Sequence, residues 1–231
     1  MSTATVLPDR LERFMQPEFK LRRGIGKGVN GYADVCVMQA VAWLAGDAEF
    51  TDAPDCACLA IRGYCVRIND SWLFDDNHRH LLKPFAPRIV GTKATTAIER
   101  ARAMLACDYA VRVFAPIRLR ALRREEWASR LESLSPITGR KSATLARIAT
   151  RAIQESAYAA ADAVTYAAAD AAAYAAAAAA AYAAAAAAAY ADLAAAADAA
   201  ADVAAAAAAD VAAAALRHKA LECLDGMLAI Q

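Results

Sequence analysis

Cysteine and histidine are the residue types in this chain best suited to metal or nucleophilic chemistry, and six cysteines and three histidines occur among its 231 residues. Cys56 and Cys58 are separated by a single residue, whereas structural zinc sites usually pair cysteines two to four residues apart. If residues 55–69 are helical, the two thiols point to different sides of that helix. His78 and His80 are also two residues apart, so on a helix they too would point to different sides. The spacing therefore predicts no metal site and no cofactor.

The same thiols would have to carry any enzymatic function. Catalysis by a cysteine–histidine pair needs a base beside a thiolate, and nothing in the sequence places one there. A free cysteine is usually a buried packing residue. We therefore interpret Cys36, Cys56, Cys58 and Cys65 as core residues, and a thiol- or metal-dependent enzyme is the third functional hypothesis.

A glycine-rich stretch, RRGIGKGVNG, invites comparison with a phosphate-binding loop. That motif requires a glycine, four residues, and then Gly-Lys followed by Ser or Thr. Here Gly28 follows Gly26-Lys27, and Leu21 stands where the first glycine belongs. The glycines therefore predict a hinge, and we expect residues 1–32 to form a flexible N-terminal arm with one short helix.

Arginine dominates residues 112–151, which carry ten basic and three acidic side chains, net +7, whereas residues 152–231 carry two and nine, net −7. Arginine is suited to forked contacts with phosphate and carboxylate groups. The stretch can be a solvated face partly paired with its own glutamates, a surface for the acidic tail, or a nucleic-acid site. The predicted binding residues are Arg112, Arg118, Arg120, Arg123, Arg124, Arg147 and Arg151.

The elements that position these residues are all predicted to be helical, because no alternating strand pattern occurs. Residues 33–135 are expected to form a compact helical domain. Residues 33–46 are apolar on nearly every side, which predicts a central buried helix ending at Gly46. Further helices are expected over residues 51–69, 75–83, 92–116 and 117–134, with prolines at several of their ends.

The C-terminal third predicts one very long helix over residues 143–225, which contain neither glycine nor proline. Between Ala157 and Ala215, 43 of 59 residues are alanine, the best helix former. Gly226 is expected to end the helix. At 1.5 Å per residue the unbroken helix would span roughly 120 Å. The fold class is thus all-α, with a compact N-terminal domain and a long alanine-rich helix.

The other residues of the tail predict two helix faces. Six aspartates between residues 162 and 210 fall within an arc of about 120°, which indicates a solvated acidic face. Because a 100-residue domain is too small to cover such a helix, we expect a homo-oligomer in which the tails of two copies pair. The packing residues would be Val164, Leu193, Val203 and Val211.

Two features bear on the cellular setting. Residues 171–191 carry no charge and are long enough to span a bilayer, but they are alanine and tyrosine flanked by Asp170 and Asp192. We therefore expect no contact with a membrane. The N-terminus lacks the apolar segment of an export signal, so a cytoplasmic protein with reduced thiols is expected.

The block VCVMQAVAWLAGDAEFTDAPDCACLAIRGYCVRIND, then LLKPFAPRIVGT and the alanine–tyrosine–aspartate tail, resembles a family of uncharacterised bacterial and tailed-phage proteins. The resemblance implies a phage or prophage setting, with a host-modifying or anti-defence role and a host protein as partner, but no site residue. The tail is similar in composition to type I fish antifreeze helices, which space threonines regularly, whereas this tail has Thr165 alone.

These observations favour a non-enzymatic interaction or structural protein that acts through its long helix and its arginine-rich stretch. The alternative is a nucleic-acid-binding protein that uses the basic segment 112–151.

Overall fold

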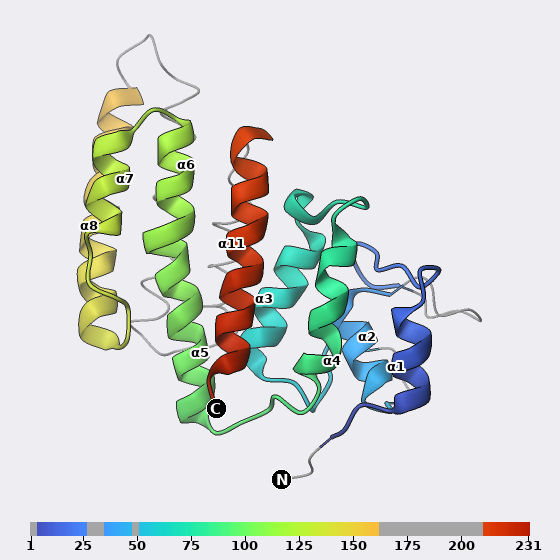
Figure 1. The fold of residues 1–231 in the computed structure, drawn as a ribbon. Coiled ribbons are helices and arrows are strands. Elements are labelled where there is room, and N and C mark those ends of the chain that lie inside the picture. Colours follow the sequence, from blue (N-terminus) through green and yellow to red (C-terminus); the bar gives the residue numbers. More distant parts are fainter. Residues whose placement is uncertain (1–3, 27–34, 48–50, 162–209) are drawn as a thin grey trace.

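The computed structural model describes residues 4–26, 35–47, 51–161 and 210–231. Its helices stand in a row of roughly parallel rods (Figure 1). No β-strand occurs within these ranges, where an isolated parallel bridge joins Leu21 to Val35. The prediction of a mostly helical protein is therefore confirmed for this part of the chain. None of the helices described is both long and apolar enough to cross a bilayer.

The described elements are α1 (Pro8–Met15), α2 (Val37–Leu44), α3 (Leu59–Asp70), η1 (Trp72–Phe74), η2 (Arg79–Phe85), α4 (Ala86–Ile89), α5 (Thr96–Tyr109), η3 (Ala110–Phe114), α6 (Ala115–Ala121), α7 (Glu125–Glu132), α8 (Arg140–Ala161) and α11 (Asp210–Ala229).

Helix α2 is the buried helix that its composition predicts. All eight of its residues are buried, and Gly46, with φ 98°, lies just beyond its end. Burying an unpartnered amide costs about 1–3 kcal/mol. The polar side chain of the helix, Gln39, is hydrogen-bonded through both of its polar atoms to the backbone of Gly26 and Cys36. The burial of this helix follows from its having no polar face to expose.

The N-terminal residues expected to form a flexible arm belong to the core where they are described, over residues 4–26. Phe14, Phe19 and Leu21 are buried in the same hydrophobic cluster as α2. The ring of Phe19 stacks on Trp43, with 5.5 Å between ring centroids. The short helix expected from Pro8 is present as α1, and its apolar side faces α2.

One rod runs from α5 through η3 into α6 (Figure 1), so the helix end predicted at Pro116 is wrong. Residues 110–114 form a π-helical turn, in which the N–H of Ala115 donates to the carbonyl oxygen of Ala110. This wider turn lets the chain pass a proline without a break. The break falls instead at Arg123, whose φ is 58°, and the helix predicted over residues 117–134 is divided there into α6 and α7.

Two other helix boundaries also differ from the predictions. The helix expected from residue 51 begins only at Leu59, because residues 51–58 form turns in which the N–H of Cys58 donates to Thr92. Pro84 lies within η2, and Pro87 lies in the first turn of α4. A proline is tolerated in a first turn because the N–H it lacks would have no partner there.

The tail predicted as one helix over residues 143–225 is described at its two ends, as α8 and α11. Ile153 of α8 and Leu216 of α11 belong to the same hydrophobic cluster. One straight helix would hold its ends roughly 120 Å apart, so α8 and α11 are not parts of a single straight rod. Helix α11 packs against α5, α6 and α3.

The remaining tail predictions fall on residues 162–209, which lie outside the described residues and include Val164, Leu193 and Val203. Val211 lies in the first turn of α11.

Gly226 does not end the tail helix, because α11 continues to Ala229. A Cβ atom at Gly226 would lie 3.0 Å from Cδ2 of Leu105 on α5. The residue therefore lets two helices approach closely, and it is not a stop signal.

Candidate functional site

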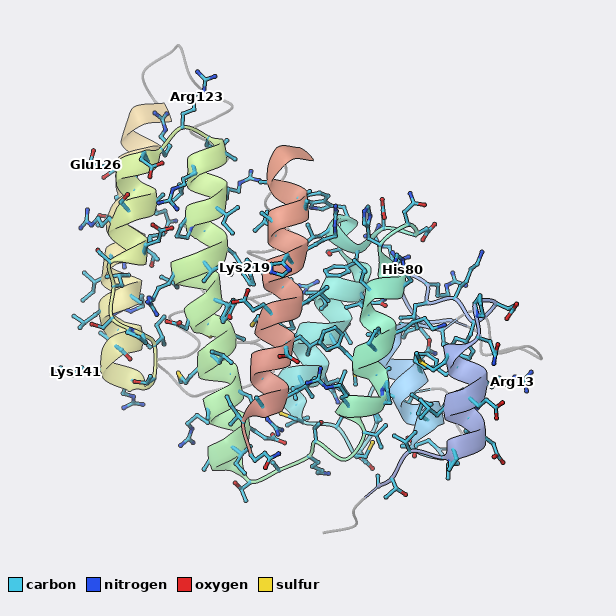
Figure 2. All side chains as sticks on the ribbon, in the orientation of Figure 1. Arg13, His80, Arg123, Glu126, Lys141 and Lys219 are labelled. Atoms are coloured by element: carbon cyan, nitrogen blue, oxygen red, sulfur yellow. The ribbon has the colours of Figure 1, made fainter. Side chains whose placement is uncertain are left out.

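The structure brings the predicted arginine residues together on neighbouring elements. Arg112 lies in η3, Arg118 and Arg120 lie in α6, and Arg147 and Arg151 lie in α8. Helix α6 packs on α7, and α7 packs on α8. Arg123 lies at one end of this unit and Lys141 at the opposite end (Figure 2). We call the outer side of these three helices the α6–α8 surface.

Part of this positive charge is already neutralised within the α6–α8 surface. Arg120 donates from Nη2 to Oε2 of Glu132 at 2.6 Å and from Nε to Oε1 of Glu125 at 3.0 Å. The hydrogen bonds from Arg120 lower the pKa of Glu132 below its usual range. These pairs agree with one of the three hypotheses for residues 112–151, a solvated face whose arginines are partly paired with its own glutamates.

Two more of the predicted arginines have acidic partners on their own helical rod. The Nη1 atom of Arg112 lies 3.0 Å from Oδ2 of Asp108, and Nε of Arg151 lies 3.1 Å from Oε1 of Glu155. Both pairs are one helical turn apart. The pair of Arg151 is exposed, and exposed pairs contribute only a few tenths of a kcal/mol, whereas the pair of Arg112 is partly buried. They set side-chain orientation more than they stabilise the fold.

Arg118 differs from these residues because it is buried and pairs with no acidic side chain among the described residues. Its side chain lies on α6 with 9% relative exposure, and its Nε atom has no hydrogen-bond acceptor in the part of the chain that the structure describes. Burial lowers the pKa of Arg118 below its usual range. A buried cation without a partner is unfavourable for the fold, and such groups recur at functional sites.

Helix α8 carries an exposed apolar pair between basic residues. Leu145 and Ile148 are 55% and 57% exposed. Lys141 lies four residues before Leu145, and Arg151 lies three residues after Ile148, so the four side chains share one helical face. We call this row the α8 stripe. The two apolar side chains are adjacent on the helix, and adjacent exposed apolar side chains are a feature of surfaces that bind another chain.

The cysteines are packing residues where the structure describes them. Cys36 caps α2, where its Sγ accepts from the N–H of Gln39, and burial raises its pKa to about 11. Burial also raises the pKa of Cys107 to about 12. Thiols of this kind are protonated near neutral pH and are poor nucleophiles.

The suspected metal ligands do not converge. Cys58 is buried at the start of α3, whereas Cys56 is only partly buried. Nδ1 of His78 lies 2.6 Å from Oδ1 of Asp75. Within the described ranges, no three Cys, His, Asp or Glu side chains gather in a way that could hold a metal ion.

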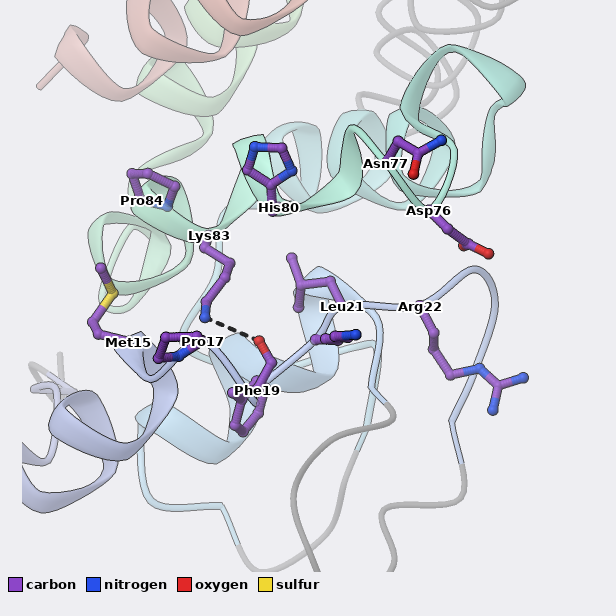
Figure 3. Close-up of a pocket in the computed structure, with 11 residues that line it drawn as sticks. Met15, Pro17, Phe19, Leu21, Arg22, Asp76, Asn77, His80, Lys83 and Pro84 are labelled. Carbon is purple, nitrogen blue, oxygen red and sulfur yellow. Dashed lines mark hydrogen bonds between the residues drawn. The ribbon is translucent and has the colours of Figure 1, made fainter.

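A cavity of about 810 Å³ lies between residues 15–22 and η2 (Figure 3), and the sequence did not reveal it. Its basic lining residues are Lys20, Arg22, His80 and Lys83. The two pairs are some sixty positions apart in the chain. The only local signal was the basic run KLRR at residues 20–23, which does not indicate where the chain folds against it.

Comparison of the chain with protein-family models, with curated proteins and with solved structures finds no match. The α6–α8 surface and the cavity are therefore the two features on which functional proposals rest.

Proposed function

We propose that this chain is a non-enzymatic interaction protein whose α6–α8 surface binds an acidic helical segment. The observation that carries the proposal is the α8 stripe, because Leu145 and Ile148 are exposed on a well-formed helix beside cations. Arg118 adds a buried positive charge to the same group of helices. An acidic amphipathic helix would cover the apolar pair and supply carboxylates to the arginines.

The chain itself contains a partner of this chemistry. Residues 152–231 have a net charge of −7, and residues 112–151 have +7. A second copy of the chain is therefore the proposed partner, which makes the protein a homo-oligomer. The resemblance to phage and prophage proteins extends the proposal to an acidic host protein bound by the same surface.

Sedimentation velocity of the full chain at tens of micromolar tests self-association. We expect a dimer or larger species at low salt that dissociates as salt rises, because opposite charges on exposed surfaces are screened. A variant with Leu145→Glu and Ile148→Glu should sediment as a monomer. Leu59→Glu, at an exposed leucine of α3, is the matched control and should behave as the wild type. A wild-type monomer at low salt, or an unaltered double variant, contradicts the proposal.

Nucleic-acid binding is the second candidate function, favoured by the exposed basic side chains of Arg123, Arg130 and Lys141 on the α6–α8 surface. If these contact phosphates, duplex affinity should fall steeply with salt. Replacing all three by glutamine should then reduce the slope of log affinity against log salt by roughly 3. The full chain must be used, because removing residues 152–231 would also remove α11 from the core. Absence of duplex binding at low salt excludes this function.

A further inference from the structure

We propose that the cavity between residues 15–22 and η2 is a binding site for a small organic anion, with an oxyanion group held by Lys83, Lys20 and His80 and an apolar body against the adjacent wall. The site is distinct from the α6–α8 surface, which lies at the other end of the row of helices (Figure 1).

Lys83 provides a fixed ammonium group on the cavity wall. Its Nζ atom donates to the carbonyl oxygens of Gln16 and Phe19, each at 2.9 Å, and Figure 3 shows the second of these bonds. The same atom lies 5.3 Å from the ring centroid of Phe14. An ammonium group has three N–H donors, so one donor remains for a ligand. Because the group is already held in place, binding costs little side-chain entropy.

The electrostatic setting of Lys83 favours an anion. Burial lowers the pKa of Lys83, and nearby Glu18 offsets this shift only in part. No carboxylate among the described residues is hydrogen-bonded to the ammonium group, whose partners are two backbone carbonyls and two aromatic rings. A partly desolvated cation without an ionic partner gains more from an incoming anion than a fully hydrated one does.

The other charged residues of the cavity reinforce this preference. Lys20, Arg22 and His80 also line it, and Asp76 is the acid among its described lining residues. Asp76 is committed elsewhere, because Nη1 of buried Arg79 lies 2.5 Å from its Oδ1. The lining is therefore positive overall, and a cleft lined by one sign of charge concentrates ligands of the opposite sign.

The shape and lining of the cavity indicate an organic ligand and not a bare ion. A volume of about 810 Å³ lies in the range of small-molecule sites, about 300–1,000 Å³. Met15, Leu21 and Pro84 provide apolar lining beside the cations (Figure 3). This combination fits a phosphate monoester or carboxylate joined to a ring or short aliphatic body.

The wall that carries Lys20 and Arg22 is held in place by the core. The side chain of Asn69, fully buried in α3, donates to the carbonyl oxygen of Arg22 at 2.9 Å. Leu21 forms the bridge to Val35. The cavity is thus formed before a ligand arrives, as is usual for small-molecule sites.

Calorimetric titration of the full chain at pH 7 and low salt tests the site, with phenyl phosphate as the probe. Inorganic phosphate and benzyl alcohol, each carrying one half of the probe's chemistry, are titrated in parallel. We expect phenyl phosphate to bind at least tenfold more tightly than either. Trp43, stacked on Phe19, gives a second readout through its fluorescence. Inorganic phosphate binding as tightly as phenyl phosphate would overturn the proposal. So would the absence of phenyl phosphate binding up to ~10 mM, which corresponds to a binding free energy weaker than about 3 kcal/mol.

Two sets of variants assign the binding to this cavity. Lys83→Met should weaken phenyl phosphate binding at least tenfold. Lys83 also donates to two backbone carbonyls, so its loss can affect folding. The double variant Lys20→Gln and His80→Gln therefore repeats the test on two exposed side chains, where we expect the fold to stay intact. It should also weaken phenyl phosphate binding tenfold. Lys93→Gln, an exposed lysine beside a different cavity, should bind as the wild type. Unchanged affinity in the double variant refutes the assignment even if Lys83→Met fails to fold.

Discussion

The carboxamide of Gln39 holds the backbone of Gly26 by both of its polar groups. Its Nε2 donates to the carbonyl oxygen of Gly26 at 3.0 Å, and its Oε1 accepts from the N–H of Gly26 at 2.8 Å. The same Oε1 accepts from the N–H of Cys36 at 3.1 Å. One buried side chain therefore joins Gly26, within the glycine-rich stretch, to Cys36 at the start of α2. The N–H of Gly26, which a phosphate-binding loop would offer to its ligand, is used by the protein itself.

Replacing Gln39 by leucine should lower the free energy of unfolding by about 2–4 kcal/mol, because it leaves two buried N–H groups and one carbonyl without partners. Urea unfolding followed by circular dichroism measures the change. Gln16→Leu, at an exposed glutamine after α1, is the control and should change stability by less than about 0.5 kcal/mol. Equal effects of the two substitutions would show that the bonds to Gly26 do not stabilise the fold.

Gly226→Val should lower the free energy of unfolding by about 1–3 kcal/mol, because the new side chain meets Leu105 where even a Cβ atom lies at 3.0 Å. Adding Leu105→Ala should recover part of that loss, and a double-mutant cycle measures the coupling. Ala214→Val, at an exposed position of the same helix, controls for helix propensity. Additive effects of Gly226→Val and Leu105→Ala would contradict close packing of α11 on α5.

Arg118→Met should raise the free energy of unfolding by about 1 kcal/mol, because it removes a buried cation that has no acidic partner among the described residues. The substitution keeps a side chain of similar length. Arg120→Met should not, since it breaks the pairs with Glu125 and Glu132. Thermal unfolding compares the two variants. If Arg118 serves binding, as proposed for the α6–α8 surface, the stabilised variant should also self-associate more weakly. Destabilisation by Arg118→Met would show that the residue is a structural one.

Thiol reactivity should separate Cys56 from the other five cysteines. Cys56 is partly buried, and the other five are buried. At pH 8 a chromogenic disulfide reagent should therefore modify one thiol rapidly and five only in denaturant. Raising the pH to 9 should not release Cys36 or Cys107, whose pKa values are raised to about 11 and about 12, because the thiolate is the reactive form. Cys56→Ser should abolish the fast phase. Rapid modification of a second thiol would contradict this burial pattern.

The pair formed by Arg120 and Glu132 should stabilise the fold only above mildly acidic pH. The pKa of Glu132 is lowered in the folded state, so its contribution is present above the unfolded pKa of about 4.3. It is lost as pH falls through the lower folded value. NMR titration of the Glu132 carboxyl carbon should show this low pKa, and Arg120→Gln should return it toward its usual range. An unaltered pKa in that variant would contradict the pairing.

The local sequence pattern was sufficient to predict that the chain is mostly helical and that α2 is buried. Helix propensity and hydrophobic periodicity act over one or two turns, so a segment without a polar face can be recognised as buried from its own letters. Gly46 at the end of α2 follows from the same short-range physics. Pro116 shows its limit, because the proline that normally breaks a helix is accommodated by a π turn just before it.

Charge and spacing identified the arginine-rich segment, but they did not predict which arginines are buried and which are paired. The sequence of residues 112–151 predicts a basic segment, whereas packing decides that Arg120 is paired on the surface. Packing also decides that Arg118 is buried, with no acidic partner in the part of the chain that the structure describes. Burial and pairing depend on which helices face each other. A neighbouring residue in the sequence carries little information about that.

The sequence by itself determined the helical character of the chain, the charge asymmetry and the unsuitable spacing of the cysteines, because each is a property of residue types along a short stretch. Only the tertiary structure decided that α8 and α11 contribute to one hydrophobic cluster and that Gly226 packs closely on Leu105. It alone also placed Lys83 and residues 15–22 around the same cavity. These are contacts between residues sixty or more positions apart. They form because separate apolar faces are buried together, and no local propensity encodes which faces meet.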